Sequence, residues 1–179
     1  SIDGAGDVRH VLLPAALCVD ARIRNGELIG DPTEGALLTL AIKAGLNPDD
    51  AVEHLPRIAE IPFDSATKFM ATFHHEGDQV RLCVKGAPDV LLGLSSYHLV
   101  DNAASPMDEE TRADFAAENE ALAEQALRVL ALARRSMAAG DVLDEAALSE
   151  GLVFLGLAGM IDPPRARAMA AIKTCHAAG

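Results

Sequence analysis

The chain has 179 residues, of which half are hydrophobic and 23% are charged, a balance typical of a globular domain rather than of a disordered segment. Fifteen Lys and Arg against 27 Asp and Glu give a formal net charge of −12, which excludes nucleic-acid binding through a basic surface. No hydrophobic run approaches the roughly 20 residues that a bilayer-spanning helix needs, and three cysteines without a Cys-x-x-Cys spacing favour reduced thiols in a cytosolic compartment.

The first third of the chain contains one segment of undecided type and one clear helix start. The hydrophobic segment 11–21 is compatible with either a short helix or a strand. Segment 31–34 combines an N-cap aspartate, a proline suited to the first helical position and Glu34 three residues after the cap. We therefore expect a helix that ends at Gly45, with Glu34 as its capping-box glutamate.

A β-hairpin is predicted in the middle of the chain. Segments 68–74 and 79–85 alternate in hydropathy on either side of the turn signal Glu76-Gly77-Asp78. Successive side chains of a strand point to opposite faces, so Phe69 and Phe73 share one face of the hairpin. We expect that face to lie against the hydrophobic core.

The opposite face of the predicted hairpin carries two lysines that suggest a ligand. With Glu76 and Gly77 as the turn, Lys68 lies directly across from Lys85, and two positive charges about 5 Å apart disfavour the sheet. A polyanion between them would remove the repulsion, and Gly86 would let it approach the backbone closely. The alternative is that both lysines extend separately into solvent, which is the commoner arrangement, so the hairpin alone does not establish a site.

The remaining segments predict further strands and helices, while familiar site motifs are absent. We expect strands at 57–63, 95–100, 128–135 and 152–161, and helices beginning near 86, 106 and 165. The sequence contains neither a GxxxxGK[ST] phosphate loop nor a GxGxxG fingerprint in the context that a dinucleotide site requires. His74 and His75 are adjacent on a strand and point to opposite faces, which does not suit a metal site.

Five segments nevertheless resemble, in order, the nucleotide-binding domain of P-type ATPases of the calcium-pump type (type II). They are 30–37 (GDPTEGAL), 62–70 (PFDSATKFM), 84–88 (VKGAP), 127–133 (LRVLALA) and 159–165 (GMIDPPR). The resemblance implies an α/β (α+β) domain with a largely antiparallel, twisted β-sheet flanked by helices. It also implies a nucleotide-binding domain over residues 1–161, and a hinge and first helix leading back to the phosphorylation domain over 162–179.

The same resemblance implies which residues surround an adenine base. Phe63 is placed as the aromatic side chain that stacks on adenine. Lys85, Gly86 and Ala87 match the Lys-Gly-Ala element that lines the base pocket. Met70 falls at the position of a methionine in that pocket.

A second group of positions is implied to contact the rest of the nucleotide. Lys68 and Arg128 match cationic residues that face the phosphates, and Leu130 matches a residue beneath the base or ribose. Glu34 resembles a carboxylate near the adenine amino group, so its expected capping role and this role compete or coexist. Ser65 replaces an arginine that calcium pumps often have at this position, so one phosphate contact is expected to be missing.

The function implied by the resemblance is ATP binding, with Mg²⁺ in the intact enzyme, in a pump that couples ATP hydrolysis to cation transport. The implied partners are the phosphorylation, actuator and transmembrane domains of the same protein, and the implied location is the cytoplasmic side of a membrane protein, the plasma membrane being expected. The 179 residues lack the DKTGT, TGD and GDGxND elements, so we expect them to bind nucleotide without hydrolysing it. We therefore assign no catalytic residue and no metal ligand. The alternative is a non-catalytic protein-interaction module that retained the fold, and the sequence does not indicate which ion is transported.

Overall fold

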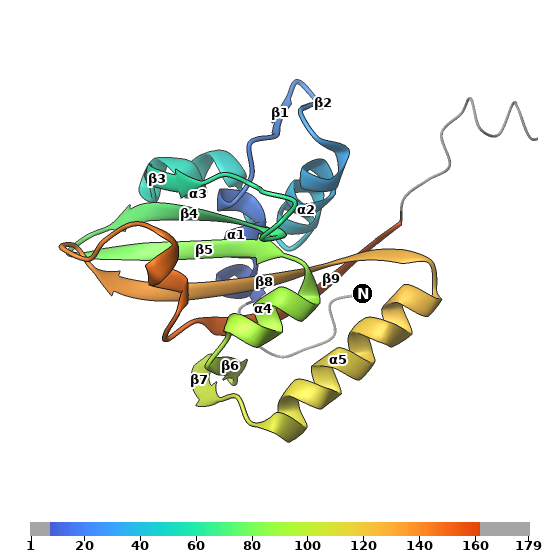
Figure 1. Cartoon of the computed structure of the whole chain (residues 1–179). Helices are drawn as coiled ribbons and strands as arrows, with labels where there is room; N and C mark the ends of the chain where they lie inside the picture. Colours follow the sequence, from blue (N-terminus) through green and yellow to red (C-terminus); the bar gives the residue numbers. More distant parts are fainter. Residues whose placement is uncertain (1–7, 162–179) are drawn as a thin grey trace, which may run out of the picture.

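The fold is a seven-stranded β-sheet with helices on both faces, seen in a computed structural model that describes residues 8–161 (Figure 1). The strand order is β3-β4-β5-β8-β9-β6-β7, and all neighbouring strands are antiparallel except β6 and β9, which are parallel. The predicted fold class is confirmed. The strands of this sheet are β3 (Arg57–Ile61), β4 (Phe69–Glu76), β5 (Gln79–Gly86), β6 (Tyr97–Val100), β7 (Ala103–Pro106), β8 (Leu127–Ala138) and β9 (Val153–Ile161).

Helices cover the two faces of this sheet, and a small second sheet lies against α2 (Figure 1). The segment of undecided type is a helix as far as Leu17, and a short antiparallel pair of strands follows it. The helical elements are α1 (Val8–Leu17), α2 (Pro32–Lys43), α3 (Pro48–His54), α4 (Pro88–Leu94), α5 (Glu109–Glu124) and the 3₁₀ helix η1 (Glu145–Leu148), and the strand pair is β1 (Arg22–Arg24) with β2 (Glu27–Ile29). No helix between Val8 and Ile161 combines the length and hydropathy needed to cross a bilayer.

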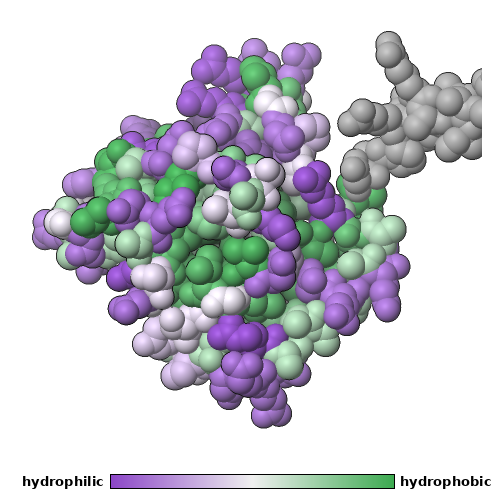
Figure 2. Space-filling model, viewed as in Figure 1, coloured by the Kyte–Doolittle hydropathy of each residue, from purple (hydrophilic) through white to green (hydrophobic). Residues whose placement is uncertain are grey.

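Each face of the large sheet buries its own hydrophobic core. One core lies under α4, α5 and η1 and contains Phe69, Phe73, Leu82, Leu91 and Phe154. The other face lies under α1 and α2 and contains the side chains of Met70, Cys83, Leu132 and Ala158, which pack against Leu17, Cys18 and Leu37. Viewed from the α4 and α5 side, hydrophobic residues occupy the middle of the molecule and hydrophilic residues surround them (Figure 2).

The predicted hairpin exists, but its register differs from the prediction by two residues. Its turn consists of Gly77 and Asp78, so Lys85 pairs with Met70 rather than with Lys68. Gly77 has φ = 60°, the positive value that a type II′ turn requires at its first central position, and this geometry matches the twist of the flanking strands. The predicted pairing of Lys68 with Lys85 is therefore wrong.

The prediction of which side chains face the core is confirmed, because a shift of two residues preserves the face on which each side chain lies. Phe69 and Phe73 are both buried in the core under α4. The opposite face is also covered, by α1, and Met70 and Cys83 are buried there. The lysine side of the hairpin is thus an interior surface of the domain and not an open one.

His74 is a buried histidine whose ring is fully hydrogen-bonded in its neutral form. Its Nδ1 donates to the carbonyl of Leu55 at 2.9 Å, which leaves Nε2 to accept a hydrogen bond from the Thr72 hydroxyl at 2.8 Å. Burial lowers the pKa of His74 to about 4; the Leu55 carbonyl opposes this effect, and the charges of Arg57 and Arg81 add to it. The protonated form is therefore disfavoured in the folded state.

We expect the folded state to lose stability as the pH falls from 6.5 towards 4. The unfolded state, in which His74 has its ordinary pKa near 6.5, binds more protons in this window, so protonation favours unfolding. Between pH 7 and pH 5 the contribution of His74 amounts to about 2 kcal/mol. Urea denaturation at both pH values measures this change, with His74→Gln as the control that removes the titrating group. An equal pH dependence in both proteins would contradict the prediction.

Candidate functional site

A buried ion pair between Glu34 and Lys85 lies at the centre of the predicted site. Asp31 caps α2, because its carboxylate accepts hydrogen bonds from the backbone amides of Thr33 and Glu34. The Glu34 side chain does not complete a capping box. One carboxylate oxygen accepts from the amides of Asp20 and Ala21, at 2.9 and 2.7 Å, and the other accepts from Nζ of Lys85.

Both members of this ion pair are shielded from solvent. The Lys85 side chain is 8% exposed and the Glu34 side chain 14%. Lys85 extends from the end of β5, whereas Glu34 extends from the first turn of α2, so the pair ties the helix to the sheet. The prediction that Glu34 is a capping-box residue is wrong, because two amides from another segment and the Lys85 ammonium satisfy its oxygens instead.

Lys68 lies apart from Lys85, in the turn that precedes β4. Its backbone adopts φ = 58°, its side chain is exposed, and its Nζ lies 3.8 Å from a carboxylate oxygen of Asp89. The turn is organised by Asp64, whose side chain accepts from the amide of Ala66 and whose carbonyl accepts from the amide of Lys68, both at 2.7 Å. Lys68 is thus a solvent-facing cation held by an ordered turn.

Phe63 projects into solvent at the other end of this turn. It follows β3, and 62% of its surface is exposed, in contrast to the buried Phe69 and Phe73. An exposed aromatic side chain contributes little to the stability of the fold, and it offers a flat apolar surface to a ligand. The structure places Phe63 and Lys68 at the two ends of one short loop.

Glycine at position 86 is required by the local packing. The expectation that Gly86 lets a ligand approach the backbone closely is wrong. A Cβ at this position would lie 2.7 Å from the Lys68 carbonyl oxygen and 2.8 Å from side-chain atoms of Phe69 and Leu91. The neighbouring Ala87 donates its amide to the same Lys68 carbonyl at 2.9 Å. The space beside Gly86 is therefore filled by protein, because the turn before β4 crosses the end of β5 at this point.

Met70, Arg128 and Leu130 point to the same face of the sheet as Lys85, but they differ in exposure. Met70 is buried beneath α1, Leu130 is half-buried and packs near α2, and Arg128 is exposed. Burial raises the pKa of Asp31, yet hydrogen bonds from Thr33 and Glu34 and the positive charge of Arg128 outweigh it, so this pKa is lowered overall. Arg128 thus lies within electrostatic reach of the start of α2.

The nine predicted residues converge on one end of the sheet. The start of β4, the end of β5 and the start of β8 meet there, because these neighbouring strands are antiparallel. The first turn of α2 supplies Glu34, and the loop after β3 supplies Phe63. Segments far apart in the sequence thus bring together one exposed aromatic side chain, two exposed cations and one buried ion pair.

Two cavities lie elsewhere and include none of these nine residues. The larger, about 910 Å³, is bordered by α1, α2, α3, β1 and β3, and the smaller, about 360 Å³, lies between α2 and β9. Between Val8 and Ile161 no group of three or more His, Cys, Asp or Glu side chains is arranged to hold a metal ion. At the candidate site, the exposed side chains of Phe63, Lys68 and Arg128 thus accompany the buried Glu34–Lys85 pair.

Comparison with known proteins identifies the domain. The family described as "P-type ATPase, cytoplasmic domain N" matches residues 7–167. The chain belongs to this family. The N domain is 41% identical over 184 residues to the "Calcium-transporting ATPase" of Bacillus subtilis, with 100% of the chain and 21% of that protein covered. It is 40% identical to "Cation-transporting ATPase pma1" of Synechocystis, with 99% of the chain and 20% of that protein covered.

A third relative extends this pattern. The N domain is 40% identical over 181 residues to "Probable cation-transporting ATPase F" of Mycobacterium bovis, with 96% of the chain and 19% of that protein covered. The chain thus spans about a fifth of the length of these relatives. The resemblance stated from the five sequence segments is confirmed: the chain is the N domain of a P-type ATPase.

Proposed function

We propose that this N domain binds ATP within a P-type ATPase that couples ATP hydrolysis to cation transport across a membrane. The observation that carries the proposal is the convergence of exposed Phe63, exposed Lys68 and the Glu34–Lys85 pair at one end of the sheet. Stacking on Phe63 would supply affinity for the base, because every nucleobase has a π-face that an aromatic ring can cover. Such a role also explains a large apolar side chain left in solvent.

The charge distribution supports placing the phosphates of the nucleotide near Lys68 and Arg128. The chain carries a net charge of −12, so a triphosphate is repelled except where cations are concentrated. Lys68 and Arg128 are exposed at this end of the sheet and are the residues proposed to face the phosphates. Lys85 is proposed to line the base pocket with Gly86, Ala87, Met70 and Leu130, and Glu34 to accept a hydrogen bond from the adenine amino group.

The proposed setting is the cytoplasmic side of an integral membrane protein, with the phosphorylation, actuator and transmembrane domains of the same pump as partners. The relatives are named as calcium- or cation-transporting ATPases, which supports this setting. Mg²⁺ is proposed to accompany ATP in the intact enzyme, held by the phosphates and by other domains. We propose a boundary after residue 161, and the expected hinge and helix at 162–179 lie outside the described residues.

We expect ATP to bind the isolated N domain weakly and without turnover. A single domain presents only part of the interactions in an intact pump, so we expect a Kd on the order of 0.1–1 mM, equivalent to about −4 to −5.5 kcal/mol. In ¹H–¹⁵N NMR titrations, the amides of 63–68 and 84–87 should shift on ATP addition. No phosphate release is expected, since the 179 residues contain no DKTGT element.

Three outcomes would contradict this proposal. An absence of shifts would favour the alternative, a protein-interaction module that retained the fold. Shifts confined to residues distant from the loop 63–68 would place the nucleotide elsewhere. Steady-state ATP hydrolysis by the pure protein that persists in Lys85→Ala would contradict the expectation that this domain binds ATP without hydrolysing it. Added salt should weaken the phosphate contacts more than the base contact, because exposed charges are screened.

A further inference from the structure

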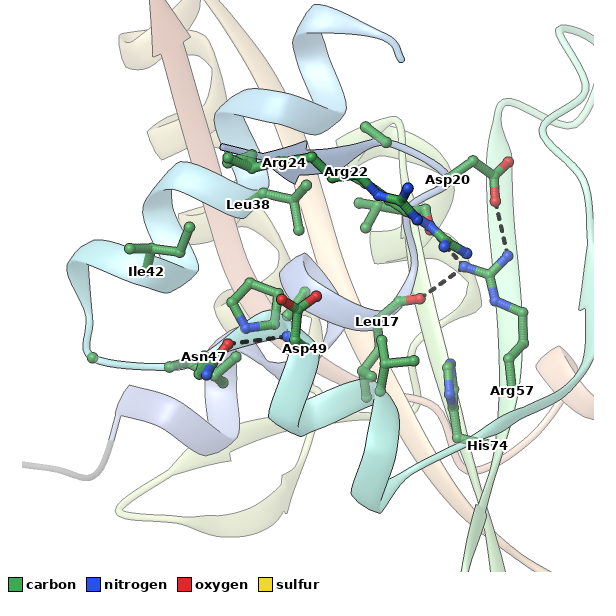
Figure 3. Close-up of a pocket in the computed structure, with 18 residues that line it drawn as sticks. Leu17, Asp20, Arg22, Arg24, Leu38, Ile42, Asn47, Asp49, Arg57 and His74 are labelled. Atoms are coloured by element: carbon green, nitrogen blue, oxygen red, sulfur yellow. Dashed lines mark hydrogen bonds and ion pairs between the residues drawn. The ribbon is translucent and has the colours of Figure 1, made fainter. Parts of the chain in front are cut away.

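The larger cavity of the N domain is a second candidate site, separate from the proposed nucleotide site. It encloses about 910 Å³ and lies between α2 and α3 on one side and β1 and β3 on the other (Figure 3). This volume falls within the range of small-molecule sites, roughly 300–1,000 Å³. Phe63, Lys68 and Lys85 do not line it, so the proposed ATP site does not account for this cavity.

The floor of the cavity is apolar and partly open to solvent. Leu17, Leu38 and Leu46 form its buried part. Ile42 on α2 and Val52 on α3 also line it and remain 46% and 50% exposed. An apolar ligand group that covers these half-exposed aliphatic side chains removes their hydrophobic surface from water, which favours binding.

Arginines gather at one side of this apolar floor. Arg22 and Arg24 are two residues apart on β1, so their side chains extend to the same side of the strand. Figure 3 shows Arg22 extending towards Arg57 and Asp20. Neither Arg22 nor Arg24 forms an ion pair with any other residue in the described part of the chain, so two guanidinium groups remain available in a domain whose net charge is −12.

The third arginine is already neutralised. The guanidinium of Arg57 donates to the carboxylates of Asp20 and Glu60, at 2.8 and 2.7 Å, and to the carbonyls of Leu17 and Val19. Arg57 therefore fixes the wall of the cavity instead of attracting a ligand. Asp49 lies on the α3 side of the cavity, away from β1, and limits where an anion can sit.

We propose that this cavity binds an amphiphilic organic anion, with a phosphate or carboxylate group at Arg22 and Arg24 and a short aliphatic chain along Ile42 and Val52. Guanidinium groups bind such anions through charge-assisted, often bidentate, hydrogen bonds. No Phe, Tyr or Trp lines the cavity, and His74, which does line it, is only 1% exposed. A base would therefore find no accessible ring to stack on, and a nucleotide is disfavoured. The apolar floor disfavours an inorganic ion alone, and the two available arginines disfavour a neutral ligand.

The experiment uses octyl phosphate, below its micellar concentration, as the probe in methyl NMR titrations of the N domain. We expect shifts of the Leu38, Ile42 and Val52 methyl groups, with inorganic phosphate and the neutral octyl glucoside each binding at least about tenfold more weakly. The variant Arg22→Gln with Arg24→Gln should weaken octyl phosphate binding about tenfold or more. Lys43→Gln, which removes an exposed cation of α2 that does not line the cavity, should leave binding unchanged.

A second variant keeps the test independent of the small β1–β2 sheet. Val52→Asp adds a carboxylate at a half-exposed position of α3 and should also weaken octyl phosphate binding, whereas Val52→Lys should preserve or strengthen it. Equal affinities for octyl phosphate and octyl glucoside, unchanged binding in both the arginine and the aspartate variants, or shifts confined to 63–68 would overturn the proposal.

The source of the anion is distinguished by one further measurement. Sedimentation with phosphatidylcholine vesicles that contain phosphatidate would identify a bilayer lipid as the ligand, provided that the arginine variant fails to sediment. Binding of octyl phosphate without vesicle sedimentation would identify a free amphiphile. Both results support the cavity as the site and assign it to different ligands of the same chemistry.

Discussion

Lys85→Ala is expected to destabilise the N domain by about 3–5 kcal/mol, because it leaves the buried Glu34 carboxylate without its counter-ion. Two backbone amides, from Asp20 and Ala21, remain bound to Glu34, but they carry no net charge. The register expected from the sequence implies the opposite sign, since it places Lys85 against Lys68, where their repulsion disfavours the sheet. Urea denaturation at pH 7 measures the change in free energy of unfolding.

Two further variants separate the loss of the ion pair from other effects of substitution. Lys68→Ala is the matched control, since this lysine is exposed, and it should change stability by no more than about 0.5 kcal/mol. The double variant Lys85→Met with Glu34→Gln removes both charges and should recover much of the lost stability, because a buried pair replaced as a whole costs far less than one broken. Wild-type stability in Lys85→Ala would show that Glu34 does not depend on this pair.

Substitution of two phenylalanines six positions apart is expected to have opposite consequences. Phe69→Ala removes a buried ring from the core under α4 and should cost about 3–5 kcal/mol of stability through the cavity it leaves. Phe63→Ala removes an exposed ring and should leave stability nearly unchanged, while weakening ATP binding by roughly 1–3 kcal/mol. Thermal melting of both variants with and without ATP measures both effects.

The result for Phe63 decides between a ligand-binding and a structural role. If Phe63→Ala lowers the melting temperature as much as Phe69→Ala does but preserves stabilisation by ATP, Phe63 is a structural residue and the proposed stacking is wrong. If Phe63→Ala melts normally and still gains full stabilisation from ATP, the base binds elsewhere. Family membership would survive either outcome, because it rests on the match of residues 7–167.

The sequence predicted elements and faces better than it predicted long-range partners. The alternating segments fixed which side chains of β4 and β5 face the core, and Asp31 with Pro32 predicted the start of α2. The hairpin register was wrong because Glu76-Gly77-Asp78 accommodates more than one turn, and the choice depends on whether glycine occupies the first or second central position. Here glycine takes the first, with φ = 60°.

Other features depend on contacts that no local pattern reveals. Glu34 lies three residues after an N-cap, so the local sequence predicts a capping box. Instead, its carboxylate accepts hydrogen bonds from the amides of Asp20 and Ala21 and from the ammonium of Lys85. The β1–β2 pair was missed although Asn25-Gly26 is a recognised two-residue hairpin turn, and both residues have positive φ, at 51° and 80°. Arg22 and Arg24 of the cavity could have been found from that signal.

The position of β8 in the sheet governs the order in which the chain can fold. β5 borders β4 on one side and β8 on the other, and its residue Gly86 pairs with Ala131, beyond α4, β6, β7 and α5. Closing so long an intervening segment costs entropy before any ladder bond forms, so folding of such topologies is slow. During synthesis β3, β4 and β5 emerge before β8, so β5 is a temporary free edge, able to pair with other chains until β8 arrives.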